Sequence, residues 1–310
     1  MKPLLQAIEY DTRMPRLHLA ISLAAVLPLA AAITDPVRVE QGQLSGVPGS
    51  DPSVRVYKGV PFAAPPVGDL RWRAPKPAPD WPGVRKADQF SATCMQTPYA
   101  EGSLYHSEPQ PVSEDCLYLN IWTGAKSASD KRPVMVWIHG GAFTRGSGSL
   151  PTYDGENFAK KGVVLVTVNY RLGIFGFFAH PELTQESEHH SSGDYGILDE
   201  IAALQWVQKN IAAFGGDPRR VLVFGDSAGS SSIGNLVASP LTKGLFQRAL
   251  GESGAWMGLS VAPMTKLDAA EQAGVRTATQ LGANSLAELR KNGVGSSIEV
   301  LKLLAAPVPY

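Results

Sequence analysis

One stretch constrains the fold of this 310-residue chain more than any other: Val-Leu-Val-Phe-Gly-Asp-Ser-Ala-Gly at 221–229. Its four consecutive apolar residues, two of them β-branched, are typical of a buried strand, and the residues after Ser227 follow a helical pattern. Gly225 and Gly229 fit this arrangement because a bulky side chain at either position would collide across a tight bend. The stretch therefore predicts a strand that turns sharply into a helix at Ser227.

This G-x-S-x-G turn predicts a nucleophile. The bend would expose the Ser227 hydroxyl and leave the Ala228 N–H at a helix N-terminus, where it has no partner within the helix. Further donors are predicted in the loop at 139–143, because small residues directly after a strand leave backbone N–H groups uncovered. We expect Gly141 and Ala142 to join Ala228 in an oxyanion hole. The loop by itself would also fit an ordinary glycine-rich turn.

The composition favours a packed α/β domain that binds a small ligand. A hydrophobic content of 44% is ample for a core at this length. The 28 basic and 28 acidic residues balance, and no run of like charge is present, which argues against a nucleic-acid binder. The neighbouring His189 and His190 do not indicate a metal site, since adjacent residues rarely ligate the same ion. No metal and no cofactor is expected.

The N-terminus has the parts of a secretory signal. A short basic stretch precedes an apolar run at 19–29 and three alanines at 30–32, and the run is too short to span a membrane. A buried N-terminal helix is the alternative, but Pro28 interrupts the run. We expect residues 1–32 to be an N-terminal extension and signal peptide, and 33–310 to form one domain. The mature protein would be secreted or periplasmic, without a membrane anchor.

Export agrees with the two cysteines, Cys94 and Cys116. In an oxidising compartment, an isolated pair at this spacing favours a disulfide over a metal or redox site. The bond would stabilise the fold by about 3 kcal/mol on the chain-entropy model. Two unrelated buried thiols are the alternative.

Further strand and helix patterns are present along the rest of the chain. Strands are predicted at 37–39, 43–47, 54–60, 117–122, 133–138, 162–168 and 249–252, and helices at 199–214, 265–280 and 285–291. The proline-rich segment 61–82 is expected to be an ordered loop packed by its aromatic side chains, and 181–193 a polar surface loop. The helix that begins at Asp199 lies between two buried strands, which predicts a parallel crossover.

In this order, the segments resemble the carboxylesterase/lipase type B family, which has the α/β-hydrolase fold. The resemblance runs from about Asp35 to Gly254. The motifs that carry it are Tyr57-Lys58-Gly59-Val60-Pro61-Phe62-Ala63, Pro65-Pro66-Val67-Gly68, Leu70-Arg71-Trp72, Ser113-Glu114-Asp115-Cys116-Leu117-Tyr118-Leu119-Asn120, His139-Gly140-Gly141-Ala142-Phe143, Phe214-Gly215-Gly216-Asp217-Pro218, the turn at Ser227 and Glu252-Ser253-Gly254. It implies a central, mostly parallel sheet with helices on both faces.

The resemblance also implies roles for individual residues. Ser227 would be the acylated nucleophile, with Gly141, Ala142 and Ala228 as oxyanion donors and a small-molecule ester as substrate. Cys94 and Cys116 would form the N-terminal disulfide of the family. Buried structural ion pairs would join Glu114 with Arg171, and Arg71 with Asp199; removing one partner of a fully buried pair costs about 3 to 5 kcal/mol.

Two features depart from the family. Choline-specific members place a tryptophan in the disulfide loop, where it stacks on a quaternary ammonium. Residues 95–115 contain no tryptophan, which disfavours a cholinesterase. In addition, all six histidines precede Ser227, whereas the triad acid and histidine follow the serine in this fold.

We therefore expect the C-terminal part of the fold, with the triad acid and histidine, to lie beyond residue 310. A chain without them would hydrolyse esters poorly, and the strand at 249–252 would present an open edge that favours aggregation. The leading prediction is ester hydrolysis through a serine acyl-enzyme. The alternatives are a non-catalytic binding or adhesion member of the same fold, an inactive fragment, and a peptidase or thioesterase. Adhesion relatives generally lose the serine, which this chain keeps.

Overall fold

The computed structural model describes residues 33–99, 101–103, 106, 110–254 and 265–292. The predicted N-terminal extension and signal peptide at 1–32 lie outside the described residues. The strands and helices predicted from the sequence fall almost entirely within these ranges, so most of those predictions can be compared with the structure.

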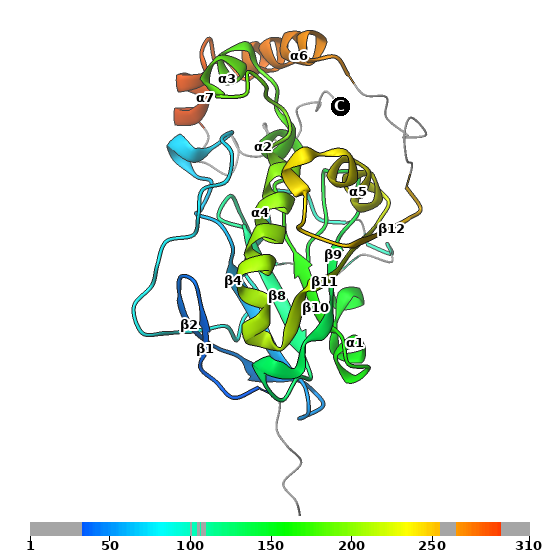
Figure 1. The fold of residues 1–310 in the computed structure, drawn as a ribbon. Coiled ribbons are helices and arrows are strands. Elements are labelled where there is room, and N and C mark those ends of the chain that lie inside the picture. Colours follow the sequence, from blue (N-terminus) through cyan, green and yellow to red (C-terminus); the bar gives the residue numbers. More distant parts are fainter. Residues whose placement is uncertain (1–32, 100, 104–105, 107–109, 255–264, 293–310) are drawn as a thin grey trace, which may run out of the picture.

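A seven-stranded sheet runs through the centre of the described fold (Figure 1). Its order is β12-β11-β9-β10-β8-β4-β3. The strands are β3 (Val47–Pro48), β4 (Arg55–Pro61), β8 (Tyr118–Thr123), β9 (Arg132–Ile138), β10 (Val164–Val168), β11 (Gly216–Asp226) and β12 (Arg248–Glu252). The pairs from β12 to β10 are parallel, and those from β10 to β3 are antiparallel. The parallel half therefore contains the strand that leads into Ser227.

The remaining strands form two smaller sheets. They are β1 (Val37–Val39), β2 (Gly42–Ser45) and β5 (Val84–Lys86) in one sheet, and β6 (Thr93–Cys94) and β7 (Val112–Ser113) in the other. β1 and β2, which correspond to the first two predicted strands, form an antiparallel hairpin with Val37 opposite Leu44. The proline-rich segment packs through its aromatic side chains as predicted, since Trp72 is buried and its indole N–H donates to the carbonyl of Ile174 at 2.7 Å.

Helices cover both faces of the large sheet. Because side chains along a strand alternate between the two faces, neighbouring residues of one strand pack against different helices. In β10, Val164, Val166 and Val168 belong to the core that includes side chains of α4 (Tyr195–Asn210) and α5 (Ala228–Ala238). Leu165 belongs instead to a separate cluster that includes Ala159 of α1 (Glu156–Lys160). The prediction of a sheet between two helical layers is therefore confirmed.

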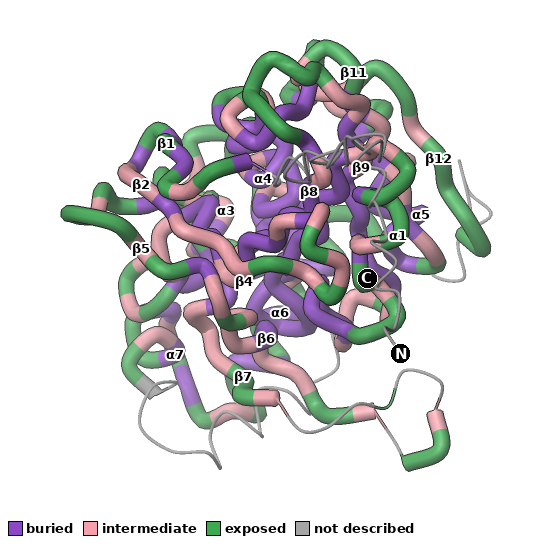
Figure 2. Tube along the Cα trace, turned by 90° about the horizontal axis from the view of Figure 1, so that it is seen from below, coloured by how far each residue is buried: buried purple, intermediate pink, exposed green. Residues whose placement is uncertain are grey.

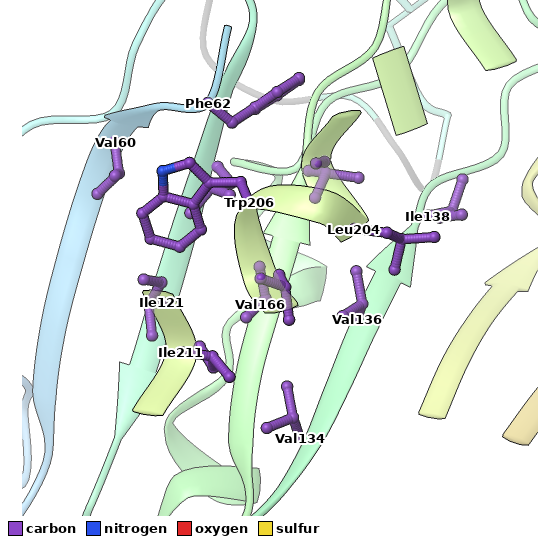
Figure 3. Close-up of a cluster of buried hydrophobic side chains, with 14 of the residues drawn as sticks. Val60, Phe62, Ile121, Val134, Val136, Ile138, Val166, Leu204, Trp206 and Ile211 are labelled. Carbon is purple, nitrogen blue, oxygen red and sulfur yellow. The ribbon is translucent and has the colours of Figure 1, made fainter. Parts of the chain in front are cut away.

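The main core lies between α4 and the strands. Figure 3 shows Leu204 and Trp206 of α4 beside side chains from β8, β9 and β10, among them Ile121, Val136 and Val166. All five are nearly inaccessible to solvent. Burying an aliphatic side chain of this size stabilises the folded state by about 1.5–3 kcal/mol, so this layer fixes where α4 and the strand ends lie.

The other helices gather at one end of the molecule, where Figure 1 shows α3, α6 and α7 together. These α-helices are α2 (Gly173–Phe177), α3 (Pro181–Glu186), α6 (Leu267–Gln280) and α7 (Leu286–Asn292). Short 3-10 helices occur elsewhere along the chain as well: η1 (Gly68–Leu70), η2 (Ala128–Asp130), η3 (Pro151–Tyr153), η4 (Ile211–Phe214) and η5 (Pro240–Thr242). Trp72, Phe178, Ala278 and Leu289 share a second apolar cluster at this end. None of the helices in the described ranges combines the length and hydropathy that a membrane crossing requires.

Two predictions about elements were wrong. The segment 181–193 is not all loop, because α3 begins at Pro181, a favoured first helical residue, and the ring of His180 accepts the Glu182 N–H at 3.2 Å. The helix predicted to begin at Asp199 begins four residues earlier, at Tyr195. Asp199 resembled a cap in the sequence, but its carboxylate is buried inside the helix and paired with an arginine.

Candidate active site

β11 turns into α5 at Ser227, as the sequence predicted. Ser227 has φ +55° and ψ −117°, a backbone conformation that residues other than glycine rarely adopt. Its N–H donates to the carbonyl of Glu252 in β12 at 2.8 Å, and its carbonyl accepts from the N–H of Ser231 at 3.0 Å. The backbone is thus held from both sides while the residue itself is exposed, so its hydroxyl can meet a substrate.

The two glycines of the turn are required by close contact with the end of β9. A Cβ added at Gly229 would lie 2.2 Å from the carbonyl oxygen of Ile138, and one at Gly225 would lie 2.6 Å from the same atom. Real Cβ atoms do not approach a backbone oxygen so closely, so any side chain would push α5 away from β9. The predicted need for glycine at 225 and 229 is confirmed, and the atom with which an added Cβ would clash is the carbonyl oxygen of Ile138.

The segment 139–146, which we call the oxyanion loop, follows β9 and reaches Ser227. A Cβ added at Gly140 would lie 3.1 Å from the Cβ of Ser227. Within the described residues, no acceptor is bonded to the backbone N–H of Gly141 or of Ala228. Ala142 follows Gly141 in the left-handed region, with φ +52°. The structure therefore brings the predicted donor loop beside the predicted nucleophile.

His139 is held in a structural position and forms no hydrogen bond to Ser227. Its ring is buried, stacks on Tyr170 with centroids 4.5 Å apart, and has its Nδ1 2.8 Å from the carbonyl oxygen of Gly140. Burial lowers the pKa of this imidazole to about 4, so the ring is neutral at physiological pH. No hydrogen bond joins Ser227 to any of the five described histidines.

Glu200, whose side chain bonds to α5, was not identified from the sequence. It is buried in α4, and its Oε1 accepts from the Ser232 hydroxyl of α5 at 2.8 Å. Burial, with Asp199 next to it, raises the pKa of this carboxyl well above its ordinary value. This hydrogen bond ties α4 to the helix that begins at the turn. The signal was available, because Glu200 lies four residues before Leu204 on the apolar face of α4.

The predicted ion-pair residues are all paired and at least largely buried, but with exchanged partners. Arg71 pairs with Glu114, with Nε 2.6 Å from Oε2, and Arg171 pairs with Asp199, with Nη2 2.7 Å from Oδ1. The predicted pairs Glu114 with Arg171 and Arg71 with Asp199 were wrong. The reason is geometric: the Arg171 N–H also donates to Asp199, at 3.0 Å, which fixes that carboxylate beside the end of β10.

The predicted disulfide between Cys94 and Cys116 is confirmed. It closes a loop that carries Glu114 to Arg71 and Gln96 to the oxyanion loop. In the part of the chain that the structure describes, no group of three or more histidine, cysteine or carboxylate side chains could hold a metal ion.

Comparison with known proteins gives consistent matches. A family model described as the carboxylesterase family matches residues 34–298. A fumonisin B1 esterase of Sphingopyxis macrogoltabida is 45% identical over 286 residues, which make up 92% of this chain and 50% of that protein. A para-nitrobenzyl esterase of Bacillus subtilis is 48% identical over 220 residues, or 71% of this chain and 43% of that protein.

The fold is shared with solved structures as well. A carboxylesterase of Geobacillus stearothermophilus superposes with a TM-score of 0.75 and 41% identity, covering 88% of this chain and 53% of that one. The chain thus spans about half the length of the curated relatives and solved structures that it matches.

Proposed function

The chain belongs to the carboxylesterase family, and from that premise we propose that it carries the nucleophilic centre of a carboxylic ester hydrolase. The resemblance found in the sequence is confirmed, and so is the α/β-hydrolase fold. The observation that supports the activity best is the position of Ser227. It is held at positive φ between a strand and a helix, beside a loop in which the Gly141 N–H has no bonded acceptor among the described residues.

The reaction would proceed through an acyl-enzyme. The Ser227 hydroxyl attacks the ester carbonyl, and the N–H groups of Gly141, Ala142 and Ala228 bind the oxyanion of the tetrahedral intermediate. Removing one such donor typically costs about 3 kcal/mol of transition-state stabilisation. The alcohol leaves, and water then releases the acid. Because no described histidine bonds to Ser227, we propose that the general base comes from outside the described residues.

The substrates would be small-molecule carboxylic esters. The relatives carry the names of esterases of fumonisin B1 and para-nitrobenzyl substrates, which share the ester bond and differ in the groups around it. Peptidase chemistry on the same turn is less well supported, because these relatives are esterases. The intact turn at Ser227 argues against a purely adhesive role.

We also propose that the protein acts outside the cytoplasm, as one domain that begins near Ile33. The basic, apolar and small-residue pattern before that residue supports export. The Cys94–Cys116 disulfide supports an oxidising compartment. No membrane anchor or nucleic-acid partner belongs to this proposal.

The decisive experiment is covalent labelling of Ser227 with a fluorophosphonate probe, located by peptide mass spectrometry. We expect a label on Ser227 and none on the Ser227→Ala variant. Ser191→Ala, at an exposed serine between α3 and α4, is the matched control and should label like the wild type. Hydrolysis of p-nitrophenyl acetate should be slow without a general base, and it too should depend on Ser227. Labelling that persists in Ser227→Ala would overturn the proposal.

A further inference from the structure

The oxyanion loop has a strained backbone. Gly141, Ala142, Phe143 and Gly146 have φ values of +110°, +52°, +55° and +117°. At Ala142 and Phe143, which are not glycines, such conformations cost free energy and persist only where the surrounding structure over-determines them. The contacts that hold the loop therefore decide whether its N–H groups keep their direction.

Contacts hold the loop in two places. The carbonyl of Phe143 accepts from the N–H of Gly173 at 2.6 Å, and its ring lies 4.9 Å from that of Phe177. At the C-terminal end, the side chain of Gln96 bonds to both backbone groups of Gly146. Its Nε2 donates to the Gly146 carbonyl at 2.7 Å, and its Oε1 accepts from the Gly146 N–H at 2.8 Å.

The Gln96 side chain is itself fixed by the disulfide loop. Its Nε2 also donates to the carbonyl of Cys94 at 3.1 Å, and Cys94 is bonded to Cys116. A side-chain amide presents an acceptor and a donor side by side, as the N–H and carbonyl of Gly146 require. A carboxylate at this position would face the carbonyl oxygens of Gly146 and Cys94 with a negative charge.

Gly146 connects the hydrogen bonds of Gln96 to the residues that lie beside Ser227. A Cβ added at Gly146 would lie 2.3 Å from Nδ1 of His139 and 2.6 Å from the carbonyl oxygen of Gly140. Gly140 in turn packs against Ser227. Because protein interiors are packed without spare volume, a shift of Gly146 would displace the residues that precede Gly141 and Ala142.

We propose that Gln96 is a positioning residue for ester hydrolysis: its paired hydrogen bonds to Gly146 hold the oxyanion loop in the conformation that directs Gly141 and Ala142 toward the substrate carbonyl. The catalytic consequence rests on the proposed function, whereas the effect on the loop does not. The test therefore measures the loop and the reaction separately.

The test compares Gln96→Ala and Gln96→Glu with a matched control, Gln110→Ala. Gln110 lies in the same disulfide loop, but its side chain accepts from the Ser149 hydroxyl and, within the described residues, forms no hydrogen bond to the oxyanion loop. Hydrogen exchange measures the protection of three backbone amides. The N–H groups of Thr144 and Arg145 donate to the carbonyl of Gly141, and that of Gly173 donates to the carbonyl of Phe143. The rate of fluorophosphonate labelling of Ser227 gives the reaction.

We expect Gln96→Ala to lower the protection of these amides about tenfold or more, and to slow labelling about 10- to 100-fold. Gln110→Ala should change neither. Gln96→Glu should behave like Gln96→Ala while its carboxylate is ionised, and should regain protection and labelling as the pH falls, because the protonated acid can again donate to Gly146. A residue with only a general structural role would not produce this pH-dependent rescue.

Unchanged protection of Thr144, Arg145 and Gly173 in Gln96→Ala would overturn the proposal, whatever the labelling rate. If Gln96→Ala loses the protection of these amides but Ser227 is labelled at an unchanged rate, the positioning role is overturned, since the reaction would then not need the hydrogen bonds between Gln96 and Gly146. If the wild type is not labelled at Ser227, the proposed function fails, and the exchange data alone decide whether Gln96 holds the loop.

Discussion

His139 shows how one buried side chain couples the site to pH. Its folded-state pKa is lowered to about 4 by burial, whereas an unfolded histidine titrates near 6.5. Between these two pKa values the unfolded state binds a proton that the folded state excludes. The contribution of His139 to the free energy of unfolding is therefore fully present above pH 6.5 and is lost as the pH falls toward 4. The difference amounts to about 3 kcal/mol.

We predict that His139→Phe, which keeps an aromatic ring against Tyr170, removes most of this pH dependence. The measurement is the free energy of unfolding in urea for wild type and variant between pH 4 and 7. The comparison of variants is necessary because Glu200, whose pKa is raised, acts in the opposite direction: its folded state favours the proton, so it stabilises more as the pH falls. Replacement of the exposed His189 by alanine is the control, and parallel curves for wild type and His139→Phe would contradict the prediction.

Single residues were predictable where the requirement is local. Ser227 and its glycines stand out because a tight strand-to-helix turn restricts backbone angles and leaves no room for a Cβ, and both demands are visible in the sequence. The partners of Arg71 and Arg171 were not predictable in this way. Either arginine could neutralise either carboxylate, and only the fold brings Asp199 beside the end of β10.

Among the elements, α5 offers the sharpest test, because it contains two glycines in different surroundings. Gly229 packs against β9, where a Cβ would meet the Ile138 carbonyl oxygen at 2.2 Å, whereas a Cβ at Gly234 would have nothing within 4 Å. We predict that Gly229→Ala destabilises the fold by about 2–3 kcal/mol through overpacking. Gly234→Ala should instead stabilise it by up to about 1 kcal/mol, because alanine restricts the unfolded chain and favours the helix.

Chemical denaturation of the two variants measures this difference directly. The substitution, the helix and the change in composition are the same, so only the contact with β9 distinguishes them. Equal unfolding midpoints would show that α5 is not seated on β9 as described. A lower midpoint for Gly229→Ala should be accompanied by slower labelling of Ser227, because the turn moves with the helix.

The strands were predictable because buried parallel strands appear as short apolar runs, and β9, β10 and β11 each contain one. Helix boundaries were less so. Asp199 has the chemistry of a cap and stands before an apolar pattern, but α4 begins earlier, at Tyr195, whose buried side chain belongs to the second core cluster. A charged side chain whose partner is distant in sequence thus carries the same local signal as one at a helix end.

For the molecule taken together, the exposed edge of the sheet has the largest consequence. Within the described residues, β12 pairs with β11 and has no strand on its other side. Figure 2 shows β12 exposed along most of its length, and Leu250 in its centre is 44% exposed. An exposed strand edge with an apolar side chain offers backbone donors and acceptors to another chain.

We predict concentration-dependent self-association in the micromolar to millimolar range, measured by sedimentation velocity. Leu250→Lys should shift the protein toward monomer, because a charged side chain on an edge strand opposes pairing with a second edge. Leu241→Lys is the matched control, since Leu241 is 52% exposed but lies in η5, outside the strand. If both lysine variants dissociate the protein equally, exposed apolar area causes the association; if only Leu250→Lys does, the edge of β12 causes it. A wild type that stays monomeric throughout this range would show that the edge is covered.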